Sequence, residues 1–186
     1  MFREHSKLEL LKVAKTRFAS YYTLLRRLLD CREQLITIFC LSKWKDLVKN
    51  ADPDTGVKVA DTIKNDHFWD EVENIVQITK PVYLLIKFCD GEGPKMGEVY
   101  ERMDNMLGEL KDIMKDNVHK DDYPLIEQIV LNRWEKMNIP IHCLGFALNP
   151  RFYYANLLKI PTPGVVERKP PNLDNEVMLG VLAAFL

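Results

Sequence analysis

The chain has 186 residues, 47% of them hydrophobic and 28% charged, which is enough to bury a core and argues against wholesale disorder. No stretch approaches the roughly 20 apolar residues that span a bilayer. The first residues also lack the apolar centre of a signal peptide. We therefore expect a soluble intracellular protein with no membrane partner.

The net charge of −1 conceals an uneven distribution along the chain. Residues 1–49 hold 11 basic and 5 acidic residues, a net of +6, whereas residues 50–122 hold 9 and 17, a net of −8. Residues 123–186 are nearly balanced at +1. A basic segment attracts phosphates and an acidic one repels them, so any DNA contact is expected in the first segment. Solvated helical faces give similar counts, so charge alone does not identify a DNA-binding protein.

Apolar residues three and four positions apart predict helices from the start of the chain. The first predicted helix covers 19–41, and a short one follows at about 43–48. Residues 51–56, with a proline and a glycine, predict a loop. A further helix is predicted over 57–64.

Two long helices follow, at 66–89 and 94–117. Asn65 or Asp66 is expected to cap the first, and Pro81 to kink or break it, because proline removes a backbone hydrogen bond. The short turn between the helices predicts that they pack antiparallel as a central pair. On the second helix the polar residues are expected on a single wet face, namely Glu98, Glu101, Arg102, Asp104, Glu109 and Lys111.

The C-terminal third predicts helices over 122–137 and 141–148. Five prolines and glycines make 161–172 an irregular loop. The last segment, 173–186, is predicted to be helical and is apolar nearly all round, so it needs cover on more than one side.

The predicted fold class is all-α, with about seven helices and little or no sheet. We expect residues 1–160 to form one helical region, 161–172 a proline-rich loop, and 173–186 a C-terminal helix of what is a piece of a longer protein. No internal repeat or sustained strand alternation is present.

Two clusters of ionisable residues are candidates for chemistry. Asp66, Asp70 and Glu73 fall near one helical face and suggest a metal hydrolase as one hypothesis, although acidic residues at a helix N-terminus more often complement its dipole. His142 and Cys143 are adjacent, so their side chains diverge on a helix and packing is the favoured interpretation. The four cysteines form no CxxC pair and are expected to be reduced. The sequence thus predicts no metal, no cofactor and no small-molecule substrate.

Basic, hydroxyl and aromatic residues gather just before and at the start of the first predicted helix, in the string from Lys15 to Tyr22. Such residues grip phosphates and stack bases at helix N-termini. The candidate DNA-binding residues are Lys15, Arg17, Phe18 and Ser20. The alternative is that Phe18 is core, with Arg17 a solvated neighbour.

This string resembles the Thr-Arg-Trp-x-Ser element of hAT-superfamily transposases, with Tyr22, Leu25 and Arg27 matching the helix that follows it. Residues 148–152 resemble the Leu-Asp-Pro-Arg-Phe element of the same family, and the strings between are similar to the plant hAT-like subgroup with a ribonuclease H-like fold. The resemblance runs in order along essentially the whole chain.

The resemblance implies a part of a transposase without its active site. In the family an Asp, Asp and Glu set binds divalent metal, with both aspartates before the first element and the glutamate after the second. By this resemblance the chain is the helical insertion between them and is not itself an enzyme. Phe18 replaces the family tryptophan that stabilises DNA, and Asn149 replaces the aspartate while keeping its capping geometry.

We therefore expect a catalytically incomplete transposase segment, located in the nucleus, whose parent binds transposon-end DNA. The alternative is a non-enzymatic interaction or dimerisation module. The expected partners are DNA, through the basic first segment, and either a second copy or the remainder of a transposase fold.

Overall fold

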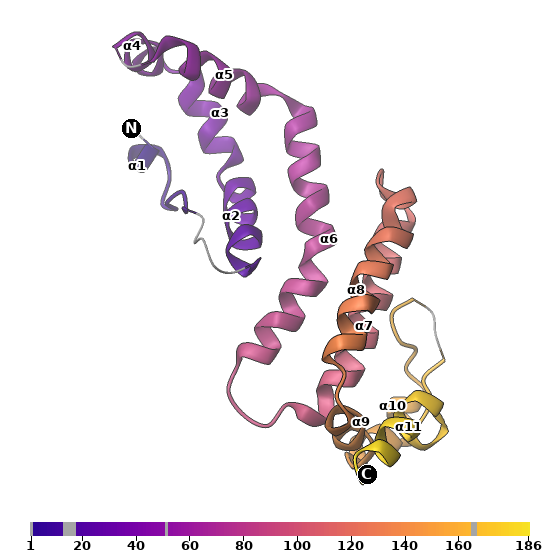
Figure 1. Ribbon diagram of the computed structural model, residues 1–186. Coiled ribbons are helices and arrows are strands. Elements are labelled where there is room, and N and C mark those ends of the chain that lie inside the picture. The colour runs from indigo at the N-terminus through magenta and orange to yellow at the C-terminus, as the bar shows by residue number, and fades with distance from the viewer. Residues whose placement is uncertain (1, 13–17, 51, 165–166) are drawn as a thin grey trace. The chain divides into compact units, whose positions relative to one another are not determined.

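The structure is a computed structural model that describes residues 2–12, 18–50, 52–164 and 167–186. This part of the chain consists of helices joined by turns and loops, and it contains no β-strand (Figure 1). The all-α prediction is confirmed. No helix among the described residues has the length and apolar character needed to cross a membrane.

The chain forms two compact units, Met1–Tyr83 and Leu84–Leu186. The helices of unit 1 are α1 (Phe2–His5), α2 (Phe18–Asp30), α3 (Arg32–Cys40), α4 (Ser42–Asn50), α5 (Pro53–Lys64) and most of α6 (Asp66–Asp90). Unit 2 contains the end of α6, then α7 (Met96–Lys115), η1 (Lys120–Asp122), α8 (Tyr123–Met137), α9 (Pro140–Ala147), η2 (Pro150–Tyr153), α10 (Ala155–Leu158), η3 (Pro171–Leu173) and α11 (Asn175–Ala183).

The predicted helix over 19–41 is two helices, because Cys31 leaves the helical conformation between α2 and α3. Its backbone has φ −100° and ψ 4°, and its side chain is completely buried. The break buries the thiol among the apolar residues of unit 1. The spacing of apolar residues does not reveal this break, because the apolar positions before and after Cys31 stay nearly in phase.

The loop predicted over 51–56 is mostly helix, since α5 begins at Pro53. The Asp52 carboxylate accepts hydrogen bonds from the backbone N–H and the hydroxyl of Thr55. Proline at the first helical position loses nothing, since that N–H has no partner within a helix. These hydrogen bonds also lower the pKa of Asp52. Asp52 and Pro53 therefore mark a helix start.

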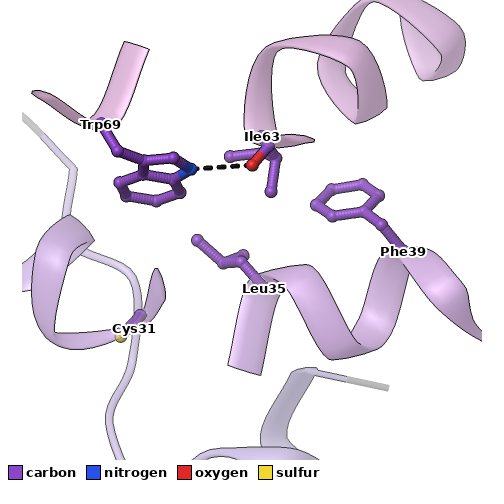
Figure 2. Packing of buried hydrophobic residues seen from close by; sticks show 5 residues of the cluster. All are labelled: Cys31, Leu35, Phe39, Ile63 and Trp69. Atoms are coloured by element: carbon purple, nitrogen blue, oxygen red, sulfur yellow. Dashed lines mark hydrogen bonds between the residues drawn. The ribbon is translucent and has the colours of Figure 1, made fainter. Parts of the chain in front are cut away.

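The core of unit 1 is organised around Trp69 (Figure 2). The indole is 1% exposed and lies close to Leu35 of α3 and Ile63 of α5. Its Nε1–H donates a 2.7 Å hydrogen bond to the carbonyl oxygen of Ile63. That carbonyl is in the last turn of α5, where no helical N–H is available to pair with it. Trp69 of α6 thus fills the core and supplies a hydrogen-bond donor to the last turn of α5.

Pro81 was expected to kink or break this helix, and because α6 continues through it, the break does not occur. Asn65 rather than Asp66 supports its start, accepting a hydrogen bond from the backbone N–H of His67. The helix runs from unit 1 into unit 2, and its expected pairing with 94–117 remains a prediction.

Unit 2 is built on α9, which packs against both α7 and α11. A Cβ at Gly97 of α7 would lie 2.9 Å from the carbonyl oxygen of Gly145, and one at Gly145 would lie 3.2 Å from Met96. On the other side, a Cβ at Gly180 of α11 would overlap the side chain of Cys143. The absence of side chains at these crossings lets the backbones approach closely.

An aromatic cluster fills the core of this unit. Tyr100 stacks on Phe146 at 5.1 Å between ring centroids, and Phe146 contacts Phe152 at 4.4 Å. Val177 of α11, fully buried, completes the cluster. The helices predicted over 122–137, 141–148 and 173–186 are confirmed, the last ending at Ala183.

We expect Trp69→Phe to destabilise unit 1 by about 2 kcal/mol, because it leaves the Ile63 carbonyl without a partner and removes buried area. Amide hydrogen exchange should show lost protection in α3, α5 and the start of α6, and unchanged protection in α9 and α11. Trp44→Phe, at a half-buried site in the same unit, is the matched control. Equal losses for the two variants would contradict this account.

Candidate functional site

Of the predicted DNA-binding residues, Lys15 and Arg17 lie outside the described part of the chain. Phe18 is the first residue of α2, and Ser20, the third, is half-buried. Tyr22, which matches the family helix, stacks on Tyr83 of α6 at 4.1 Å. The proposed contacts to DNA remain predictions, whereas Tyr22 has a packing role inside unit 1.

Part of the positive charge of the first segment is used within unit 1. Arg32 pairs with Asp66 at 2.9 Å, and Arg26 pairs with Asp30 at 3.3 Å. Arg27 donates a hydrogen bond to the backbone carbonyl of Glu9. The lysines of α4 are exposed, at positions 43, 45 and 49. Within the described part of this segment, three arginines are thus engaged by partners, whereas the exposed cations of α4 are lysines.

The acidic candidates Asp66, Asp70 and Glu73 do not form a metal site. Asp66 is the partner of Arg32, and Glu73 accepts a hydrogen bond from the side chain of Gln77. Within the residues that the structure describes, no three His, Cys, Asp or Glu side chains converge closely enough to hold an ion.

His142 and Cys143 are packing residues at the start of α9. The His142 ring stacks on Trp134, and its Nδ1 accepts a hydrogen bond from the backbone N–H of Ile139. Cys143 is 2% exposed, with its Sγ 3.9 Å from the Asn138 side-chain oxygen. Burial lowers the pKa of His142 and raises that of the Cys143 thiol, so the neutral form of each is favoured.

Asn149, which stands where the resemblance places an aspartate, caps the 3₁₀ turn η2. Its side-chain oxygen accepts a hydrogen bond from the backbone N–H of Arg151 at 3.2 Å. The expectation that asparagine keeps the capping geometry is confirmed.

Many ionisable residues line a pocket of about 420 Å³ in unit 2. This volume is in the range of small-ligand sites. Helix α7 lines one side, called here the floor, α8 contributes Tyr123 and Glu127, and residues 162–164, 167–169 and 174 line a further wall. The polar groups nearest its floor are Glu101, Asp104 and Asn105.

The wall is a strap, defined here as residues 160–164 and 167–169, which is fixed to α7. The Gly164 backbone N–H donates a 2.8 Å hydrogen bond to Asp112. Arg168 forms an ion pair with Glu101 and donates a second hydrogen bond to the carbonyl of Ile160. Pro163 rests on Gly108, where any side chain on the helix would overlap its carbonyl.

This arrangement corrects the expectation of a single wet face on 94–117. Glu101 is only 8% exposed and lies under the strap, where the guanidinium of Arg168 balances its charge. A buried carboxylate is tolerated when it is paired and hydrogen-bonded. The sequence signal that accompanies the strap is Gly108, a residue that weakens a helix unless something packs on it.

Negative charge concentrates around Asp104. Desolvation by the surrounding residues raises the pKa of its carboxyl to about 7, with smaller contributions from the negative charges of Asp174, Glu176 and Glu101. Asp104 nevertheless remains exposed at the pocket surface, so solvent moderates this effect. Burial, with the charges of Asp104, Asp174 and Glu176, likewise raises the pKa of Tyr100, which hydrogen-bonds to Glu176. On α8, burial and a 2.6 Å hydrogen bond to Glu127 raise the pKa of Tyr123 to about 12.

Comparisons with family models, with characterised proteins and with solved structures find no match to this chain. The resemblance to hAT transposases therefore rests on the sequence strings alone.

We expect Asp104→Asn to stabilise unit 2 more at pH 8 than at pH 5. The folded state holds the Asp104 proton more tightly than the unfolded chain, so the free energy of unfolding falls as pH rises from about 4 to about 7. Asparagine cannot ionise and removes this loss. Urea denaturation followed by circular dichroism at both pH values measures the difference.

The control is Asp116→Asn, an exposed residue that ends the same helix and makes the same change in charge. Its effect should be small and similar at both pH values. A shift for Asp104→Asn that does not depend on pH would show that its carboxyl is not perturbed.

Proposed function

We propose that the chain is a non-catalytic interaction module derived from a hAT-type transposase, and that it associates with a second copy of itself through unit 2. The observation that carries this proposal is the apolar outer face of α11. Catalysis is not part of the proposal, because the family's metal-binding acids would lie outside the resembling segment.

Helix α11 has apolar residues on two opposite faces. Its inner face contains Val177 and Gly180, which pack on α9, and Val181 borders the same core. The outer face contains Leu179 and Leu182, which are 68% and 61% exposed. These residues are three apart, so they form one stripe along the helix. The sequence predicts that this helix needs cover on more than one side. Helix α9 covers only the inner face.

Other apolar side chains of unit 2 are also exposed. On α8, Leu125 and Ile129 lie one turn apart and are 59% and 56% exposed. Single exposed apolar residues are common, but stripes on helices are typical of interaction surfaces. A second copy is the partner we favour, since closed twofold dimers are the commonest soluble assemblies.

The nuclear location and the relation to transposon DNA belong to this proposal through the resemblance alone. The motif strings at residues 16–20 and 148–152 support it, as does their order along the chain.

The double variant Leu179→Asp/Leu182→Asp should weaken self-association at least tenfold, because a charge in an apolar contact costs more than 1.4 kcal/mol. Sedimentation equilibrium or light scattering over a concentration series measures the change. Val118→Asp, at an exposed apolar residue in a turn of the same unit, should leave it unaffected. A wild-type chain that stays monomeric at all concentrations rules out the proposal.

DNA binding through the first segment is the second candidate. Its specific support is the net charge of +6 over residues 1–49, together with the exposed lysines of α4. Phosphate contacts by lysine and arginine give binding that weakens steeply with salt. Such binding needs no divalent metal.

For this candidate, Lys15→Ala/Arg17→Ala should weaken DNA binding and lower its salt dependence by about two phosphate contacts. Fluorescence anisotropy with a duplex, at several salt concentrations and with EDTA present, measures both effects. Lys58→Ala/Lys64→Ala on α5 is the charge-matched control. Equal losses for the two pairs would indicate general charge attraction, and Mg²⁺-dependent nicking would overturn the non-catalytic assignment.

A further inference from the structure

We propose that the pocket between α7, α8 and the strap binds an organic ammonium group, such as a lysine side chain or a polyamine. This inference does not depend on the proposed dimerisation. The outer face of α11 and the α8 residues Leu125 and Ile129 are absent from the lining of the pocket.

Two hydrogen-bond acceptors on the floor of the pocket lack donors. The Oδ1 atom of Asn105 is fully buried and has no hydrogen-bond partner. Asp104, one residue earlier on α7, also lines the pocket, is exposed, and forms no ion pair or hydrogen bond within the described ranges. Because solvent reaches this carboxylate, a ligand in the pocket that supplies N–H groups can donate to it directly. An ammonium group has three such donors and accepts none.

The charges around Asp104 favour a cation over an anion. The groups that act on its carboxyl are all negative, from Asp174, Glu176 and Glu101, and none of them lowers its pKa. The charge of Glu101 is already balanced by Arg168. Asp174 lines the pocket and caps α11 by accepting hydrogen bonds from the backbone N–H groups of Glu176 and Val177.

The other titratable and charged groups that face the pocket come from every element around it. They are Lys111 on α7, Tyr123 and Glu127 on α8, and Glu167, Arg168 and Lys169 on or beside the strap. Carboxylates outnumber cations in the lining, five to three. Lys111 and Lys169 do not offset the rise in the Asp104 pKa, so the acidic floor stays available to an incoming cation.

The remaining walls suit the stem of such a ligand. Leu107, Phe146 and Pro163 contribute apolar surface to the lining. Long amines bury their methylene groups against apolar walls while the charged end finds polar partners. The strap is fixed to α7 through Asp112 and Glu101, so the site is formed before any ligand arrives.

Isothermal titration of the full chain tests this inference with three probes at pH 8. The probes are Nα-acetyl-lysine methylamide, its uncharged counterpart Nα-acetyl-norleucine methylamide, and spermidine. Binding of the lysine derivative alone assigns the site to a protein side chain, and binding of spermidine alone assigns it to a free polyamine. Binding of both supports the shared ammonium chemistry, whereas binding of neither, or equal binding of norleucine, overturns the inference.

Asp104→Asn should weaken the ammonium probe at least tenfold, and the exposed Asp116→Asn should leave it within twofold. Binding requires the ionised Asp104, so affinity should also rise roughly tenfold between pH 6 and pH 8. This dependence should vanish in Asp104→Asn. Gly108→Ala, which displaces Pro163 without altering charge, should weaken the same probe while circular dichroism shows the helices intact. Affinity unchanged in both variants would place the ligand elsewhere and overturn the inference.

Discussion

Unit 2 depends on the close approach of α9 to two neighbouring helices. At Gly97 and Gly145 the backbones of α7 and α9 come so near that an added methyl group would press on a main-chain atom, and at Gly180 the side chain of Cys143 occupies the space that a side chain of α11 would need. Because the helices meet so closely, Tyr100, Phe146 and Val177 close into one core over very short elements. Helices of eight or nine residues are marginal by themselves, so this packing supplies most of what holds α9 and α11 in place.

The pocket is a consequence of the same arrangement. Fixing α11 on α9 brings its cap, Asp174, and the next acid, Glu176, close to Asp104 of α7. The strap then covers the helix at Gly108 and neutralises one of the acids through Arg168. An arrangement that concentrates carboxylates without pairing them all is more typical of a binding site than of a structural ion-pair network.

Periodicity and capping residues were enough to predict the fold class and most helices. The helices over 94–117 and 122–137 were placed within a few residues, since each has a clear apolar stripe and a proline near its start. The break at Cys31 and the start of α5 at Pro53 differ from the prediction, the first because the apolar spacing continues across Cys31 and the second because a proline and a glycine close together predict a loop. The pocket could not be predicted, because Glu101 and Arg168 are 67 residues apart and no local pattern connects them. Gly108 was the one local sign, and it gives no indication of what packs on it.

The two surfaces of unit 2 differ in the kind of partner they favour. The outer face of α11 contains leucines without polar groups between them, so its binding energy would come from area removed from water and would be insensitive to salt. The pocket has carboxylates on its floor, so its affinity would come in large part from charge-assisted hydrogen bonds and would change with pH and ionic strength. Helix α11 contributes Leu179 and Leu182 to the first surface, and its cap, Asp174, lines the second. Both surfaces therefore require α11 to be held on α9 through Val177 and Gly180, although the salt and pH dependence expected of each is different.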